Sequence, residues 1–166
     1  VYPWPLLAAN AENPKRNEDL IYKLYKDKQY LCSFVGADSV SYRSNIRKRI
    51  SDLHKNKYNK EILIKITNDW FYNSLVYDYQ IHNKRIDTPF LAHHYYNTIK
   101  YNQILSDSVF SLCPEGAGPN TIRLWESMSV GAIPVLFEND WCLPSIEGLQ
   151  WEDFSITIKN AEEEFL

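Results

Sequence analysis

Residues 108–144 read SVFSLCPEGAGPNTIRLWESMSVGAIPVLFENDWCLP, and this stretch decides the expected fold. Its apolar runs over 109–113 and 132–137 predict two buried strands. Between them, 121–130 has helical spacing and is followed by Gly131, which predicts a helix that ends in a left-handed glycine. A strand, a loop, a helix and a strand in this order are typical of a right-handed βαβ unit in a parallel sheet.

Similar patterns on both sides of this stretch predict further elements. We expect strands over 30–35, 61–66 and 154–158, and helices over 18–28, 40–55 and 90–105. Residues 67–88 predict a long loop, and Asn160 is a candidate cap for a final helix. Pro134 predicts a local irregularity in its strand, because proline cannot donate to a strand ladder.

The strand over 31–35 and the two strands quoted first are almost entirely apolar, which indicates burial on both faces. The expected fold is therefore α/β, a Rossmann-like parallel sheet with helices on both faces. Residues 1–16 carry three prolines and little periodicity. We therefore divide the chain into 1–29, a lead-in or linker with a short helix, and 30–166, one Rossmann-like domain.

The composition fits one globular domain without a basic face. The chain has 166 residues, of which 45% are hydrophobic and 23% charged, and a net charge of −3, which argues against a nucleic-acid binder. Its three cysteines lack CxxC spacing and argue against a disulfide framework or a zinc site, so Cys32 and Cys113 are expected as small core residues. No apolar run reaches about 18 residues and no signal peptide is visible, so we expect no membrane span.

The loop over 114–120 follows a strand, at the edge of a parallel sheet where ligands bind. Gly116 and Gly118 would let a ligand approach the backbone, and Asn120 or Thr121 can cap the next helix. The N–H groups and the dipole of that helix favour an anion. The same residues also fit a tight turn with a cap and no ligand, so both interpretations stay open.

Arg123 and Glu126 stand about one turn apart in the expected helix, on the side opposite its apolar face. A guanidinium in the first turn opposes the helix dipole, which an anionic ligand would offset, and it suits two phosphate oxygens. Glu126 would accept hydrogen bonds from ribose or sugar hydroxyls. The pattern predicts a site for a nucleotide-linked substrate, and the alternative is a surface Arg–Glu pair that contributes roughly a few tenths of a kcal/mol.

A basic cluster lies in the helix expected over 40–55. It consists of Arg43, Arg47, Lys48 and Arg49. One interpretation is a solvated helix face, and the other is that one of these arginines reaches a phosphate.

The loop lacks the GK[ST] sequence of a P-loop, which excludes an ATPase of that kind. The dinucleotide fingerprint GxGxxG is matched in part by Gly116 and Gly118, with Glu138 where a ribose-binding acid would fall. Thr121 stands in place of the third glycine and Pro119 stiffens the turn. An NAD(P)- or flavin-binding Rossmann domain therefore stays as an alternative.

A non-catalytic carbohydrate-binding module is a second alternative. In such a module Trp70, Tyr95 and Tyr96 would stack on sugar rings. His93 and His94 are adjacent and have no carboxylate cluster nearby in the sequence, so no metal site is expected.

The quoted stretch also resembles the exostosin-like glycosyltransferases, whose pattern is FCLxPxG, SxRxxEA and GCIPVI followed by a proline. The matching residues are Phe110, Leu112, Pro114, Gly116, Arg123, Glu126, Gly131, Ile133, Pro134, Val135 and Pro144. Phe34-x-Gly36 with Arg43 following it is similar to the start of that family's second domain. The chain departs from the pattern at Asn120 and Thr121, where serine is common.

The resemblance implies a two-domain glycosyltransferase of the GT-B type, with this chain as the carboxyl-terminal, donor-binding half. The donor would be a nucleotide-diphosphate sugar, most often UDP-linked, the acceptor a glycan, and no metal or other cofactor is normally required. Arg123 would be the catalytic residue that holds the diphosphate, and Glu126 would bind the ribose. The substrate site would be completed by Pro114, Gly116, Gly118, Asn120, Thr121 and Arg43. An amino-terminal partner domain outside these residues would supply most of the acceptor site and the catalytic base.

Overall fold

The computed structural model describes residues 21–56, 59–67, 82–83, 88–138, 142–145 and 147–159. Within these residues the strands form one sheet in the order β2-β1-β3-β4-β5, and every neighbouring pair is parallel. The strands are β1 (Tyr30–Ala37), β2 (Ile62–Thr67), β3 (Ser108–Cys113), β4 (Ile133–Phe137) and β5 (Ile156–Ile158). The expected parallel α/β fold is confirmed.

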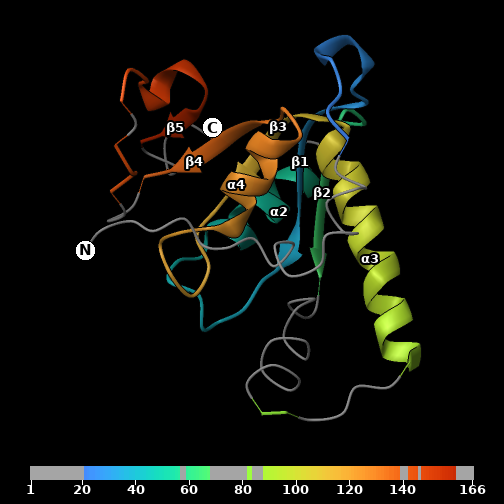
Figure 1. The fold of residues 1–166 in the computed structure, drawn as a ribbon. Coiled ribbons are helices and arrows are strands. Elements are labelled where there is room, and N and C mark those ends of the chain that lie inside the picture. The colour runs from blue at the N-terminus through green and yellow to red at the C-terminus, as the bar shows by residue number, and fades with distance from the viewer. Residues whose placement is uncertain are drawn as a thin grey trace.

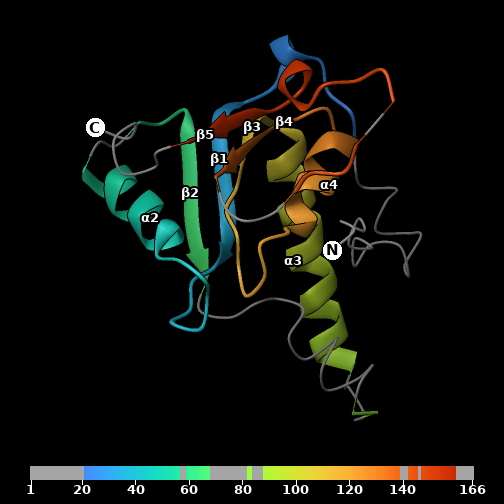
Figure 2. The same ribbon diagram turned by 90° about the vertical axis from the view of Figure 1, so that its left-hand side faces the viewer.

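Helices cover both faces of the sheet. Figure 2 shows α2 (Ile46–Asn56) on one face, and α3 (Thr88–Ser106) and α4 (Ile122–Ser129) on the other. Neighbouring strand residues point to opposite faces, so the core has two sides. The side chains packed with α2 are Phe34, Leu112, Val135 and Phe137. The side chains packed with Leu124 of α4 are Cys113 and Leu136.

The sheet reverses its direction of growth between β1 and β3. From β1 the chain passes through α2 to β2, and then returns through α3 to β3 on the other side of β1. In open α/β sheets, ligands bind where the carboxyl ends of the strands meet at such a switch point. We call this end of the sheet, where β1 ends at Ala37 and β3 at Cys113, the carboxyl edge.

Two loops lie side by side at the carboxyl edge. Figure 1 shows the loop that precedes α2 and the loop that precedes α4 extending below the strand ends. The N–H of Arg43 in the first loop donates to the carbonyl of Gly116 in the second, at 3.0 Å. The fold therefore brings the segments 38–45 and 114–121 together, although they are far apart in sequence.

The helix expected over 40–55 begins later, at Ile46. Ser39 makes a local turn in front of it, because its hydroxyl accepts the N–H of Ser41 at 3.2 Å and its carbonyl accepts the N–H of Tyr42 at 3.0 Å. Serine side chains that bond nearby backbone compete with helix formation. Arg43 consequently lies in a loop, and Arg47 lies in the first turn of α2.

The helix expected over 18–28 is wrong within the described residues. Only η1 (Tyr25–Asp27) is helical there, Leu24 before it is extended, and η1 buries none of its residues. An apolar face with nothing to pack against gives a short helix little stability. The segment 18–20, most of the loop expected over 67–88, the Asn160 cap and most of the lead-in lie outside the described residues.

The irregularity expected at Pro134 is also wrong. The β3–β4 register runs without interruption from Phe110↔Ile133 to Cys113↔Leu136, and Pro134 is paired within it. Pairing of β4 with β5 begins only at Val135. On that side Pro134 therefore has no ladder neighbour, so its missing N–H costs no β4–β5 bond.

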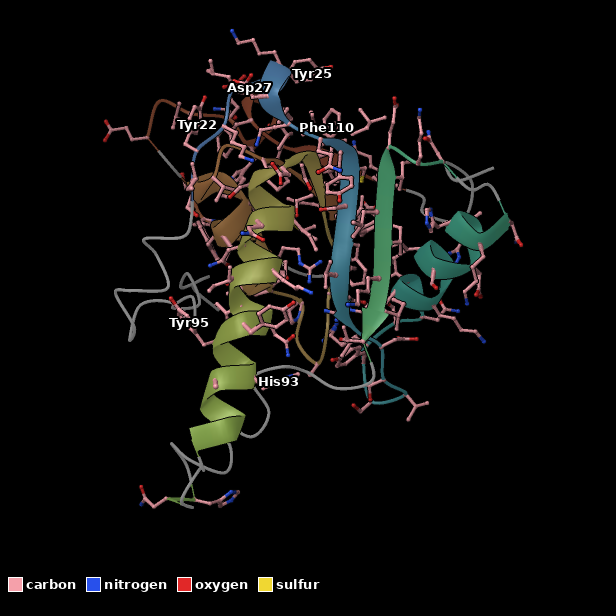
Figure 3. All side chains as sticks on the ribbon, turned by 90° about the vertical axis from the view of Figure 1, so that its right-hand side faces the viewer. Tyr22, Tyr25, Asp27, His93, Tyr95 and Phe110 are labelled. Carbon is pink, nitrogen blue, oxygen red and sulfur yellow. The ribbon has the colours of Figure 1, made fainter. Side chains whose placement is uncertain are left out.

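The opposite end of the sheet, where β1 begins at Tyr30, is the amino edge. There Lys28 Nζ donates to the carbonyl of Ser106 at 2.9 Å and to that of Val130 at 3.4 Å, next to the ion pair of Lys23 and Asp107. Figure 3 shows Tyr22, Tyr25 and Asp27 at this end. Gly131, which follows α4, has φ +66 as expected for a helix-ending glycine.

The cysteine prediction is confirmed for the core. Cys113 is buried, and Cys32 packs partly buried against the cluster on the α2 side. Burial raises the pKa of the Cys113 thiol to about 11 and that of Cys32 to about 12, so both are neutral packing residues near pH 7. No helix in the described part of the chain combines the length and apolarity that a membrane crossing requires.

Candidate functional site

Arg123 lies half-buried across the carboxyl edge. Its Nη2 donates to the carbonyl of Val35 near the end of β1, and its Nη1 donates at 3.5 Å to the carbonyl of Leu112 near the end of β3. The guanidinium also packs over two rings, 4.4 Å from the centroid of Phe34 and 5.6 Å from that of Tyr101. Arg123 therefore bridges the two strands that flank the switch point.

Glu126 is buried, at 5% exposure, and its Oε2 accepts a hydrogen bond of 2.6 Å from the hydroxyl of Tyr101. Burial raises the pKa of Tyr101 well above its ordinary value, and the neighbouring Glu126 raises it further. The phenol therefore stays protonated and acts as a donor to the carboxylate. The alternative of a surface Arg–Glu pair is wrong, because Glu126 is buried.

Gly36 makes room for this arrangement. A Cβ at Gly36 would lie 2.9 Å from Nη2 of Arg123, 3.2 Å from the ring of Phe34 and 3.6 Å from Nη1 of Arg47. Real Cβ atoms essentially never approach another heavy atom as closely as the first of these distances. A side chain at this glycine of the Phe-x-Gly sequence would therefore displace the Arg123 guanidinium.

The loop before α4 is compact at its start and open at Gly118. Pro114 is fully buried, and the N–H of Gly116 donates to the carbonyl of Gly118 at 3.2 Å. No described atom lies within 4 Å of where a Cβ on Gly118 would stand, so the backbone is approachable there, as expected. Asn120 is half-buried in the same loop.

Thr121 occupies the N-cap position of α4, but its side chain makes no capping hydrogen bond. The expectation that Thr121 could cap the helix is therefore wrong for its side chain. The exposed N–H groups of a first turn favour an anion, and α4 directs this end toward the carboxyl edge.

Arg43 and Arg47 both reach the loop before α4, in different ways. The Arg43 side chain is 41% exposed, and its Nε lies 3.4 Å from Oε2 of Glu115. Arg47 instead donates to three backbone carbonyls, from Nε to Glu115 at 2.9 Å, from Nη1 to Ala37 at 2.6 Å and from Nη2 to Pro114 at 3.4 Å. The sequence left open which member of the basic cluster faces the ligand edge, and the structure places Arg47 inside it.

The charge of Arg47 is held in an unfavourable environment. Burial, and to a lesser extent the nearby Arg123, lower the pKa of its guanidinium to about 10. Its guanidinium carbon lies 4.5 Å from the centroid of the Tyr42 ring. Arg47 is still charged near pH 7, so the carboxyl edge holds two cations side by side.

Tyr101 is a site residue that the sequence did not indicate. It lies on α3, whose apolar spacing marks it only as a residue four positions before the buried Leu105. Contact with Arg123 and Glu126 depends on α3 returning along the sheet beside α4. The local sequence around Tyr101 carries no motif that predicts this contact.

The remaining sequence candidates lie elsewhere. Tyr95 and Tyr96 are exposed on α3, with Lys100 Nζ 4.4 Å from the Tyr96 ring centroid. Figure 3 shows His93 and Tyr95 on the half of α3 farther from the amino edge. Trp70 and the side chain of His94 lie outside the described residues. In the described part of the chain no three His, Cys, Asp or Glu side chains are placed to hold a metal.

Comparison with known proteins gives a family for this arrangement. The model of the Exostosin GT47 domain matches residues 4–164. An Exostosin-1 homolog of Caenorhabditis elegans is 25% identical over 97% of this chain, which spans 38% of the relative's length. A probable beta-1,4-xylosyltransferase of Arabidopsis thaliana is 32% identical over 40% of this chain and 16% of its own length. A probable glucuronosyltransferase of Oryza sativa subsp. japonica is 41% identical over 37% of this chain and 14% of its own length. Because the family model covers nearly all of the sequence, the chain belongs to the Exostosin GT47 domain family.

Proposed function

We propose that this chain is the donor-binding domain of a glycosyltransferase that moves a sugar from a nucleotide-diphosphate sugar, UDP-linked, to a glycan acceptor. The observation that carries the proposal is the position of Arg123 across the switch point of a sheet in this family. Relatives named as xylosyltransferases and glucuronosyltransferases support glycosyl transfer as the reaction class.

Arg123 would act on the leaving group. When the bond between the anomeric carbon and the diphosphate oxygen breaks, negative charge develops on that oxygen. A guanidinium fixed by strand carbonyls and an adjacent helix N-terminus stabilise this charge without having to reorganise. The acceptor hydroxyl forms the new bond to the anomeric carbon and gives its proton to a base, which we assign to the amino-terminal partner domain.

Glu126 would contact the ribose. An ionised carboxylate offers about four acceptor positions, and the bond from Tyr101 occupies one of them. Because Glu126 is only 5% exposed, a ribose hydroxyl would have to reach the small part of this residue that is exposed. The Tyr101 hydrogen bond would hold the carboxylate in place for that contact.

The loop before α4 would follow the diphosphate. Gly118 presents open backbone, and Pro114, Gly116, Asn120 and Thr121 shape the path to the helix N-terminus. Arg43, in ion-pair contact with Glu115, would lie at the rim of the site. The two alternatives from the sequence, a dinucleotide-binding domain and a carbohydrate module, gain no support from the family relationship.

Calorimetric titration of the chain with UDP, GDP, UDP-sugars, NADH and free oligosaccharides tests this proposal. We expect binding of a nucleoside diphosphate and its sugar form, with weaker or no binding of NADH. Binding of NADH alone would favour the dinucleotide alternative. Binding of oligosaccharide without any nucleotide affinity would favour a carbohydrate module, and either outcome contradicts the proposal.

A further inference from the structure

Two guanidinium groups meet at one point of the carboxyl edge. Nη2 of Arg123 and Nη1 of Arg47 would lie 2.9 Å and 3.6 Å from the same Cβ position on Gly36. Both guanidinium carbons also lie over the Phe34 ring, at 4.4 Å for Arg123 and 5.5 Å for Arg47. We call Arg47 and Arg123 the arginine pair.

Backbone carbonyls hold the arginine pair from both sides. Arg47 is bound by Ala37, Pro114 and Glu115, and Arg123 by Val35 and Leu112. These bonds fix the position of each guanidinium but leave some of its N–H groups unused. No described carboxylate forms an ion pair with either arginine, since Glu115 pairs with Arg43. Asp38 and Glu115 attract Arg47, but each effect is smaller than the repulsion from Arg123, so two like charges are kept together at close range.

We propose that Arg47 is a second phosphate-binding residue, which together with Arg123 selects a diphosphate over a monophosphate. The inference rests on the proposed function, because it names the chemistry of the donor group that the edge would bind. Two adjacent guanidiniums can each take one phosphate group of a pyrophosphate, whereas a monophosphate offers oxygens on one phosphorus only. A bound dianion also relieves the repulsion within the arginine pair.

The position of Arg47 makes this role specific to one member of the basic cluster. Lys48 is exposed on the same helix, and Arg43 is engaged with Glu115. Gly116 lies next to Arg47, whose Nη2 is 3.1 Å from a Cβ built there. Arg47 thus reaches the loop before α4, which would follow the phosphates. Replacing Lys48 removes the same charge from the same helix and is therefore a matched control.

The test is calorimetric titration of wild type, Arg47→Gln and Lys48→Gln with inorganic pyrophosphate, orthophosphate, UDP and uridine. Wild type is expected to bind pyrophosphate at least about tenfold more tightly than orthophosphate. Arg47→Gln is expected to weaken pyrophosphate and UDP at least about tenfold and to leave uridine unchanged, whereas Lys48→Gln stays within about twofold throughout. Equal losses in the two variants, or a matching loss of uridine in Arg47→Gln, would overturn the assignment.

A second variant covers the case in which Arg47→Gln does not fold, because Arg47 also bonds strand and loop carbonyls. Arg47→Lys keeps the charge but loses the planar fork, so pyrophosphate binding should fall at least about threefold with uridine unchanged. Wild-type pyrophosphate affinity in Arg47→Lys would overturn the inference. Pyrophosphate binding without nucleotide binding would contradict the proposed function but support phosphate binding by the arginine pair. Nucleotide binding that is unchanged in the Arg47 variants would support the proposed function but contradict the role of Arg47.

Discussion

The two edges of the sheet hold cations in opposite electrostatic settings. At the amino edge, Lys28 donates to carbonyls at the carboxyl ends of α3 and α4, where the helix dipoles favour a positive charge. At the carboxyl edge, Arg123 stands in the first turn of α4, where the dipole opposes a positive charge, and Arg47 lies beside it.

Both edges satisfy their cations with backbone carbonyls, but at the amino edge the nearest opposite charge outweighs the nearest like charge, and at the carboxyl edge it does not. Lys28 has Asp107 nearby, which favours its protonated form. For Arg47, the repulsion from Arg123 is larger than the attraction from either Asp38 or Glu115. We infer that the amino edge is a structural contact complete within the chain, whereas the carboxyl edge is arranged for an anion from outside.

Replacing Arg123 should give the largest loss of ligand binding at the carboxyl edge. In Arg123→Met, UDP affinity and sugar transfer should fall at least about tenfold, because a charge-assisted phosphate contact contributes roughly 1.5–3 kcal/mol. The carbonyls of Val35 and Leu112 also lose a donor, so the free energy of unfolding should fall. Calorimetry with UDP and denaturant unfolding measure the two effects. Wild-type UDP affinity in a folded Arg123→Met variant would refute the role given to this residue.

Filling the space at Gly36 should give the next largest effect. In Gly36→Ala the new methyl group would meet Arg123 and Phe34, so we expect a several-fold loss of UDP affinity. Overpacking of this kind costs roughly 1–3 kcal/mol in the free energy of unfolding. Gly118→Ala is the matched control, because open space surrounds that position, and its stability should stay within about 0.5 kcal/mol of wild type. Equal destabilisation in both variants would mean that Gly36 is not a close-approach position.

The parallel fold could be predicted because its strands are continuous apolar runs. Such runs, separated by segments with helical spacing of apolar residues, fit few folds other than a parallel α/β sheet. The observed β3, α4 and β4 lie within one residue of their expected bounds. The late start of α2 could not be predicted, since the Ser39 turn competes with a helix through local hydrogen bonds. The shortening of the expected helix to η1 could not be predicted either, because Ile21, Leu24 and Tyr25 stay exposed rather than packing on the domain.

The candidate site was predictable only where one segment carries it. The loop before α4, Arg123 and Glu126 belong to one βαβ unit. Their spacing in the sequence was therefore enough to predict that they lie close together. Tyr101 and Arg47 come from other helices, and their contacts depend on how α3 and α2 pack on the sheet. The burial of Glu126 likewise follows from α3 lying beside α4, which no local pattern predicts.

Changing Glu126 should separate ribose contacts from phosphate contacts at the carboxyl edge. Glu126→Gln keeps the shape and the acceptor oxygen for Tyr101 but removes the charge. We expect UDP affinity to fall about threefold to tenfold, with the affinity for inorganic pyrophosphate unchanged. Parallel titrations with both ligands measure the difference. An equal loss for both ligands would place Glu126 in the support of Arg123 rather than at the ribose.

The smallest effect on binding is expected at the amino edge. Lys28→Met removes the donor shared by the carbonyls of Ser106 and Val130, so the free energy of unfolding should fall by about 1 kcal/mol. UDP affinity should stay at the wild-type value, because Lys28 lies at the far end of the sheet from the arginine pair. A loss of UDP affinity in a folded Lys28→Met variant would show that the two edges are not independent.

The pH dependence of stability should also differ between wild type and Lys28→Met. Burial lowers the pKa of Lys28 below its ordinary value of 10.5, so the folded chain releases this proton at lower pH than the unfolded chain does. Between the two pKa values the unfolded state holds more protons, and the stability contributed by Lys28 rises with pH across that window. Denaturant unfolding of wild type and Lys28→Met at increasing pH should therefore show a difference that grows toward alkaline pH. A difference that stays constant or shrinks would contradict the lowered pKa of Lys28. It would mean that the carbonyl and Asp107 contacts fully compensate the burial of this lysine, and the amino edge would then favour a cation even more than we infer.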